Sequence, residues 1–109
     1  MKIDDIELLV LQFENRTLLR VEWTHEAHLI VAISYCWDFD DEMAFEKMKA
    51  NITTYNRSVG TENTDISGYH ETMTIFWMRF LRKYLNDNEF ESVEDACNSF
   101  FESEFASQN

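Results

Sequence analysis

The sequence predicts an all-α fold, a compact single-domain bundle of about five helices spanning residues 1–109. A chain of 109 residues is long enough for one domain with its own core. Its composition, 45% hydrophobic and 15% aromatic, excludes a disordered chain. There is no proline and there are only two glycines, so the sequence has few points at which helices would be interrupted.

The first two helices are predicted from the spacing of apolar residues. Residues 4–14 carry Ile6, Leu9, Val10 and Phe13 at three- and four-residue steps, which is the pattern of one helix face. The polar stretch 15–20 follows. Thr24 is a suitable N-cap for a second helix that continues to about residue 35 and is apolar on most of its surface. This helix is expected to lie at the centre of the bundle.

Three further helices complete the prediction. Asp40 can cap the third helix, which has near-heptad apolar spacing at Phe45, Met48, Ile52, Tyr55 and Val59. Residues 60–68 contain both glycines and predict the one long loop. The fourth helix is expected over about 69–85 and the fifth over about 92–105. Their apolar residues are expected in the core, including Met73, Phe76, Trp77, Phe80, Phe100 and Phe101.

The charge of the chain limits its partners. Nine basic and 21 acidic side chains give a formal net charge of −12. Such a surface repels phosphate backbones and anionic lipids, so neither nucleic acid nor a membrane is expected as a partner. It also raises the local concentration of cations. A small molecule or another protein remains as the expected partner, and the sequence does not indicate an oligomeric state.

The cysteines and the N-terminal sequence predict a cytoplasmic protein. Cys36 and Cys97 lie in apolar helical patterns far apart in the sequence, which favours two buried thiols in a reducing compartment over a disulfide. The opening residues MKIDDIELLV place acids before the apolar run and lack a small-residue cleavage site, unlike a signal peptide. No apolar run reaches the length of a transmembrane helix.

All three histidines fall in two short motifs, VEWTHEAHL at residues 21–29 and GYHETMT at residues 68–74. His25 and His28 are three residues apart, so a helix places them on one face. His70 is expected in the first turn of the fourth helix, where the helix dipole favours neutral imidazole. Neutral imidazole binds transition metals, so the pattern predicts a buried site that binds a divalent ion such as Zn, Fe or Ni.

Other residues of the motifs could assist these three ligands. Glu71 lies about 100° around the fourth helix from His70 and is the candidate catalytic residue, because it could move a proton at the edge of the site. Glu26 points away from the histidine pair and is not expected to bind metal, while Glu22 could complete the ligand set. The residues expected to orient the ligands, or to complete the set, are Glu14, Trp23, Thr24, Tyr69 and Thr72.

The two histidine motifs together resemble an uncharacterised family of small bacterial cytosolic helical proteins. Its members have a W/F-x-H-x-x-H-L/V motif and, later in the chain, Y-H-E-T-x-T. The resemblance covers roughly residues 13–77 of this chain, and residues 86–109 lie outside it. It implies no activity, but it marks as signature positions Trp23, His25, His28, Tyr69, His70, Glu71 and Thr72.

Two classes of function follow from these motifs. In the first, the protein binds a divalent transition metal and is a metalloprotein or a metal-dependent enzyme of unknown reaction. In the second, the histidines only hydrogen bond and pack, and the protein is a metal-free helical module for binding or interaction. A cavity beside the histidines with an open coordination position would favour the enzyme.

Overall fold

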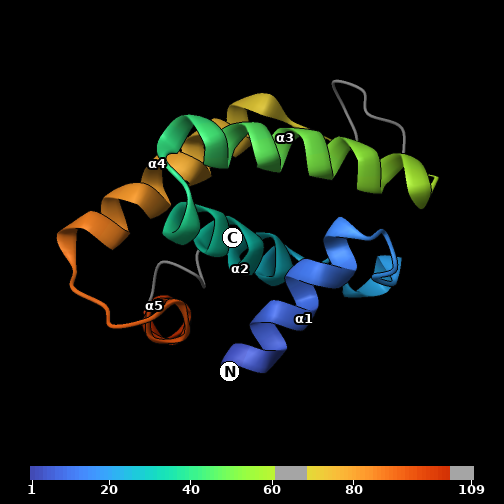
Figure 1. Ribbon diagram of the computed structural model, residues 1–109. Coiled ribbons are helices and arrows are strands. Elements are labelled where there is room, and N and C mark those ends of the chain that lie inside the picture. The colour runs from blue at the N-terminus through green and yellow to red at the C-terminus, as the bar shows by residue number, and fades with distance from the viewer. Residues whose placement is uncertain (61–68, 104–109) are drawn as a thin grey trace.

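The computed structural model describes residues 1–60 and 69–103, which contain five α-helices and one short 3-10 helix (Figure 1). The elements are α1 (Ile3–Glu14), η1 (Arg20–Glu22), α2 (His25–Asp38), α3 (Asp41–Ser58), α4 (Glu71–Asp87) and α5 (Val93–Glu102). These residues include no strand, so the all-α prediction is confirmed. No helix in the same two ranges combines the length and the apolar composition that crossing a membrane requires.

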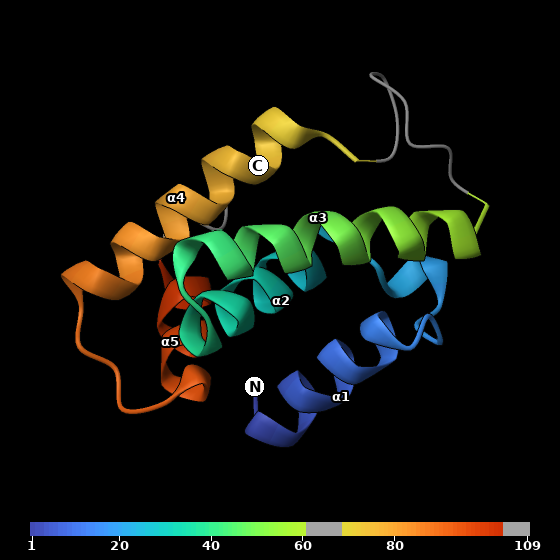
Figure 2. The same cartoon turned by 45° about the horizontal axis from the view of Figure 1, so that its top comes forward.

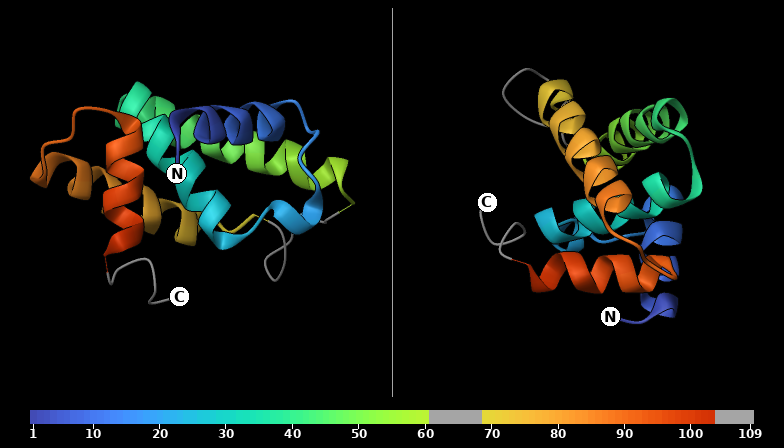
Figure 3. Two further views of the ribbon diagram at one scale, coloured as in Figure 1. Left: turned by 90° about the horizontal axis from the view of Figure 1, so that it is seen from below. Right: turned by 90° about the vertical axis from the view of Figure 1, so that its left-hand side faces the viewer.

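Helix α2 is the centre of the bundle, as the sequence predicted. All eight residues from Leu29 to Cys36 are buried, and α2 packs against each of the other four α-helices. In Figure 1, α3 and α4 lie on one side of α2, and α1 and α5 lie on the other. The two views in Figure 3 show the same arrangement. A helix covered on several sides must be apolar around most of its circumference, which explains its composition.

Side-chain caps fix where three of the helices begin. Thr24, Asp40 and Ser92 each accept a hydrogen bond from the backbone N–H three residues further on, at 3.1, 2.8 and 3.2 Å. Such a bond satisfies one of the N–H groups that a helix start leaves without an intrahelical partner. The capping roles predicted for Thr24 and Asp40 are therefore confirmed.

The turn after α1 has more structure than its polar sequence suggested. Arg16 has a left-handed backbone, with φ at 61°, and the N–H of Thr17 donates to the Gln12 carbonyl oxygen at 2.8 Å. Glycine is the usual residue at this point of a helix end. Leu18 is 4% exposed, and its carbonyl oxygen accepts the Tyr55 hydroxyl at 2.8 Å. The stretch expected to be only polar thus contributes a residue to the core.

The start of the chain is attached to α5. The backbone N–H of Ile3 donates to Glu94, and the side-chain amide of Asn98 donates to the Met1 carbonyl oxygen at 2.9 Å. On the opposite side of α2, the start of α3 lies beside the second half of α4 (Figure 2). These contacts connect helices that are distant in sequence.

Two residues expected in the core are exposed on α4. Met73 is 53% exposed and Phe76 is 54% exposed, so this part of the prediction is wrong. Helix α4 lies on the outside of the bundle and fully buries only Met78 and Leu81. Phe76 is five residues before Leu81, which places it about 140° around the helix from the buried side. Phe100 is fully buried, whereas Phe80, Trp77 and Phe101 are partly buried.

The predicted helix ends differ slightly from the observed ones. Helix α4 begins at Glu71, so His70 is its N-cap and does not lie in the first turn. Helix α5 ends at Glu102, three residues before the predicted end. Residues 61–68, which include most of the expected long loop, lie outside the described part of the chain, as do residues 104–109.

Candidate functional site

All three histidines line one cavity of about 210 Å³. His25 and His28 come from the start of α2, and His70 comes from the N-cap of α4. The structure therefore brings the two histidine motifs together, as the sequence predicted. We call this site the histidine cavity. Its other lining residues are mostly apolar or aromatic: Leu29, Ala32, Met48, Ile52, Tyr69, Met73, Thr74, Trp77 and Met78.

His28 has one ring nitrogen occupied and the other available. Its Nδ1 lies 2.7 Å from the carbonyl oxygen of Thr24. A carbonyl oxygen can only accept, so Nδ1 must be the donor, and in the neutral ring Nε2 then has the free lone pair. Burial lowers the pKa of His28, the hydrogen bond to Thr24 opposes this shift, and the nearby charge of His25 adds to it. His28 is thus held as the neutral tautomer that can bind a metal or accept a hydrogen bond through Nε2.

Trp23 packs against the ring of His28. The two rings stack with centroids 3.8 Å apart, and on its other side Trp23 stacks on Phe13 at 4.3 Å. Tyr55 contacts Trp23 at a centroid distance of 5.5 Å. Trp23 does not line the cavity itself. This column of rings and the hydrogen bond to Thr24 together fix the orientation of His28.

His25 lies at the solvent side of the cavity. It is the first residue of α2 and is exposed. Its ring packs against that of Trp77 in a T-shaped pair, with centroids 5.3 Å apart. The indole N–H of Trp77 is buried and has no hydrogen-bond partner among the described residues. Trp77, which the sequence assigned only to the core, also lines the cavity.

His70, in the second motif, lines the cavity from the N-cap of α4. Its side chain is exposed and makes no capping bond, while its carbonyl oxygen accepts from both the N–H and the hydroxyl of Thr74, each at 3.0 Å. Tyr69, the preceding residue, also lines the cavity, and burial raises the pKa of its hydroxyl. Thr72 is exposed and does not line the cavity; Thr74, two residues later, does.

Glu71, the predicted catalytic residue, is engaged elsewhere. Its Oε1 accepts from Nζ of Lys49 on α3 at 2.7 Å, and both side chains are about half exposed, at 52% and 48%. This hydrogen bond, together with the charge of Glu71, raises the pKa of Lys49. Glu71 does not line the histidine cavity. In this arrangement it joins α3 to the start of α4.

The other acids considered as ligands lie outside the cavity. Glu14 accepts the hydroxyl of Tyr35 at 2.6 Å, and that hydroxyl in turn accepts the side-chain amide of Asn51 at 2.9 Å. Burial and the bond to Glu14 raise the pKa of Tyr35. Glu22 is exposed in η1, and Glu26 is exposed in the first turn of α2. None of the three glutamates lines the cavity.

The histidines share a cavity but do not form a ligand set as their side chains stand. Within residues 1–60 and 69–103, no group of three His, Cys, Asp or Glu side chains is placed to hold a metal ion. The expectation of a buried cluster is also wrong for His25 and His70, which are both exposed. They occupy helix starts that face solvent, and only His28 extends into the bundle.

Comparisons with protein-family models, with curated proteins and with solved structures found no match to this chain. The resemblance of its two motifs to a family of small bacterial proteins therefore stays a prediction.

Proposed function

We propose that the protein binds a divalent transition metal ion in the histidine cavity, through His25, His28 and His70. The observation that supports this most strongly is that the only three histidines of the chain, from two distant segments, line one cavity. Three imidazole nitrogens suit Zn, Fe or Ni. A net charge of −12 also raises the local concentration of cations around the protein.

The side chains differ in how much they must move to share an ion. His28 is fixed, and its Nε2 is the free nitrogen. His25 and His70 are exposed, and no hydrogen bond to the described residues holds either ring. Their rotation about the side-chain bonds is therefore inexpensive. We expect both rings to turn toward Nε2 of His28 when the ion binds.

A metal with three protein ligands keeps a position for water or substrate, and a bound cation can polarise a substrate or lower the pKa of a water. Glu71 is adjacent to His70 and is the residue we assign to proton transfer. To act, it must leave its ion pair with Lys49. The ion pair is exposed, so it contributes little to stability and little free energy is needed to separate it.

Titration of metal-free protein with Zn²⁺ and Ni²⁺ by calorimetry tests this proposal. We expect one ion per chain, with binding weakened more than tenfold in His25→Ala and His70→Ala, since the loss of even an orienting residue costs about 10–100-fold. Glu26→Gln removes a charge from the same helix turn outside the cavity and is the matched control. Unchanged affinity in both histidine variants, or an equal loss in Glu26→Gln, would contradict the proposal.

A metal-free binding module is the second candidate, and the lining of the cavity favours it. Most of the wall is apolar or aromatic, as in sites for small organic ligands. Nε2 of His28 provides an acceptor for a small polar molecule. If the metal titrations show no binding, a small-molecule screen against the same histidine variants becomes the deciding experiment.

We also propose a cytoplasmic location. Cys36 and Cys97 are both buried and free, and burial raises their pKa values to about 11 and about 12. Thiols that form no disulfide are typical of a reducing compartment. The location is tested by fractionating cells that express the full-length protein, with a periplasmic or secreted pool as the contrary result.

A further inference from the structure

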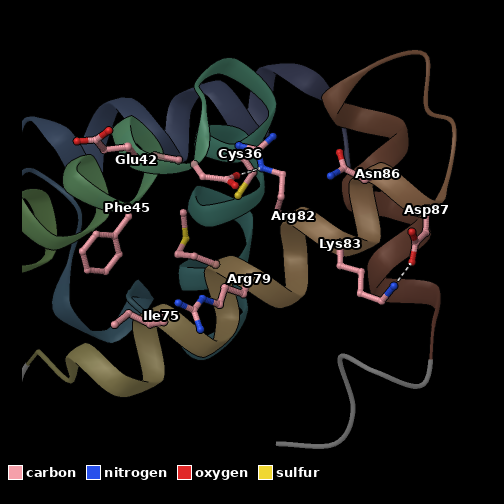
Figure 4. A pocket seen from close by; sticks show the side chains of 12 residues that line it. Cys36, Glu42, Phe45, Ile75, Arg79, Arg82, Lys83, Asn86 and Asp87 are labelled. Carbon is pink, nitrogen blue, oxygen red and sulfur yellow. Dashed lines mark hydrogen bonds and ion pairs between the residues drawn. The ribbon is translucent and has the colours of Figure 1, made fainter.

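A second, larger hollow lies between the start of α3 and the part of α4 from Ile75 to Asp87 (Figure 4). Its volume is about 720 Å³. We call it the α3–α4 groove. Its floor and sides are apolar at Cys36, Ala44, Phe45, Ile75 and Met78. Met78 also lines the histidine cavity, so the two hollows adjoin at this buried side chain.

Three of the chain's nine basic side chains line the groove, although the protein is strongly acidic. Two of them have acidic partners: Arg82 pairs with Asp41 and also donates to the Phe39 carbonyl oxygen at 2.7 Å, and Lys83 pairs with Asp87 at 2.8 Å. Arg79 differs, because it is exposed and has no ion pair among the described residues. An unpaired guanidinium therefore lies beside an apolar hollow.

The acids at the groove do not offer an equivalent site for a cation. Asp41 and Asp87 are already paired with basic groups. Glu42 is the remaining acid, and Figure 4 shows it on the α3 side, whereas Arg79 lies on the α4 side next to Ile75. At physiological salt, charges more than about 8 Å away are largely screened. The nearby guanidinium then affects a bound ligand more than the net charge of the whole protein does.

We infer that the α3–α4 groove binds a small amphiphilic anion, an apolar chain or ring system with one carboxylate that pairs with Arg79. The volume lies within the range of about 300–1,000 Å³ typical of small-molecule sites. The planar guanidinium can hold a carboxylate with two parallel hydrogen bonds. The apolar part of the ligand would cover Phe45, Ile75 and Met78, which releases water from their surfaces.

Three ligands of equal length separate charge from hydrophobicity: octanoate, 1-octanol and octylammonium. Each is titrated into the full-length protein in the presence of a chelator, and backbone amide shifts are followed by NMR. Octanoate should bind saturably, with shifts centred on Ala44, Ile75 and Arg79. Octanol should bind about tenfold more weakly, because it lacks a charge-assisted bond. Octylammonium should bind more weakly than octanol. The chelator keeps the result independent of metal binding in the histidine cavity.

Substitutions at Arg79 complete the test. Arg79→Gln should weaken octanoate about tenfold and leave octanol unchanged, and Arg79→Lys should restore part of the loss. Arg57→Gln removes the same charge from the exposed last turn of α3, outside the groove, and should behave as the wild type. The inference is overturned if octanoate does not saturate, if octanol binds as tightly, or if Arg79→Gln has no effect. Shifts centred on His25 and His70 would overturn it as well.

Discussion

The alanine variants of His28 and His70 should differ in how much they lower the free energy of unfolding. His28→Ala removes the stack on Trp23, at 3.8 Å between centroids, and the bond from Nδ1 to the Thr24 carbonyl oxygen, at 2.7 Å. An aromatic pair contributes about 0.5–1.5 kcal/mol and a hydrogen bond a similar amount. The Thr24 carbonyl oxygen keeps its bond from the backbone N–H of residue 28, so no acceptor is left unsatisfied. We expect a loss of about 2 kcal/mol in the free energy of unfolding.

His70→Ala should cost much less. Its side chain is exposed and makes no capping bond, so the change in unfolding free energy should stay below about 0.5 kcal/mol. Urea unfolding, followed by circular dichroism in a chelator, measures both variants without a contribution from bound metal. In thermal melts the His28→Ala loss corresponds to about 8–15 °C. Equal losses in the two variants, or a loss below about 0.5 kcal/mol for His28→Ala, would refute the positioning of His28 described above.

Three further predictions concern stability and reactivity. Tyr35→Phe removes the hydroxyl that donates to Glu14 at 2.6 Å and should lower the unfolding free energy by about 1–2 kcal/mol in urea melts; no loss would argue against this bond. Arg16→Gly should raise it by up to about 1 kcal/mol, because Arg16 has a φ of 61° that suits glycine, and destabilisation would contradict that backbone conformation. Cys36 and Cys97, with pKa values raised to about 11 and about 12 by burial, should react with iodoacetamide at pH 8 only after unfolding, which mass spectrometry can follow; rapid labelling of the native protein would show that the thiols are accessible.

Local sequence signals were sufficient to predict the helices. The three- and four-residue spacing of apolar side chains identified each helix, and Thr24 and Asp40 identified two of the helix starts through their caps. The central place of α2 followed from its apolar character on nearly all sides. These features depend only on residues within one or two helical turns of each other, so they can be recognised from a single sequence.

The sequence could not show which side of α4 would be covered. The spacing includes Met73 and Phe76 in the apolar pattern, yet both are more than half exposed, because the bundle covers α4 on a narrow face only. The ion pair between Lys49 and Glu71 similarly depends on how α3 lies against α4. The groove around Arg79 also arises from that packing. No local pattern encodes contacts between residues this far apart in sequence.

The histidine site was predicted in part. Helical spacing correctly placed His25 and His28 on one side of α2, and the structure brings His70 to the same cavity. The aromatic column behind His28 was not foreseen, because Phe13 and Trp23 meet only through the turn between α1 and α2. The glutamates chosen from the sequence lie elsewhere, and Trp77 was assigned to the core alone. Side chains at helix ends depend on the packing of other elements, which spacing does not reveal.

Anomalous diffraction from crystals grown with Zn²⁺ or Ni²⁺, measured above and below the absorption edge of the metal, tests the metal site most directly. We expect a single anomalous peak in the histidine cavity, about 2.0–2.2 Å from one ring nitrogen each of His25, His28 and His70, with His28 contributing Nε2. No peak in the cavity, or a peak held by carboxylates on the protein surface while the histidine rings stay apart, would contradict the proposal and leave the metal-free binding module as the function to pursue.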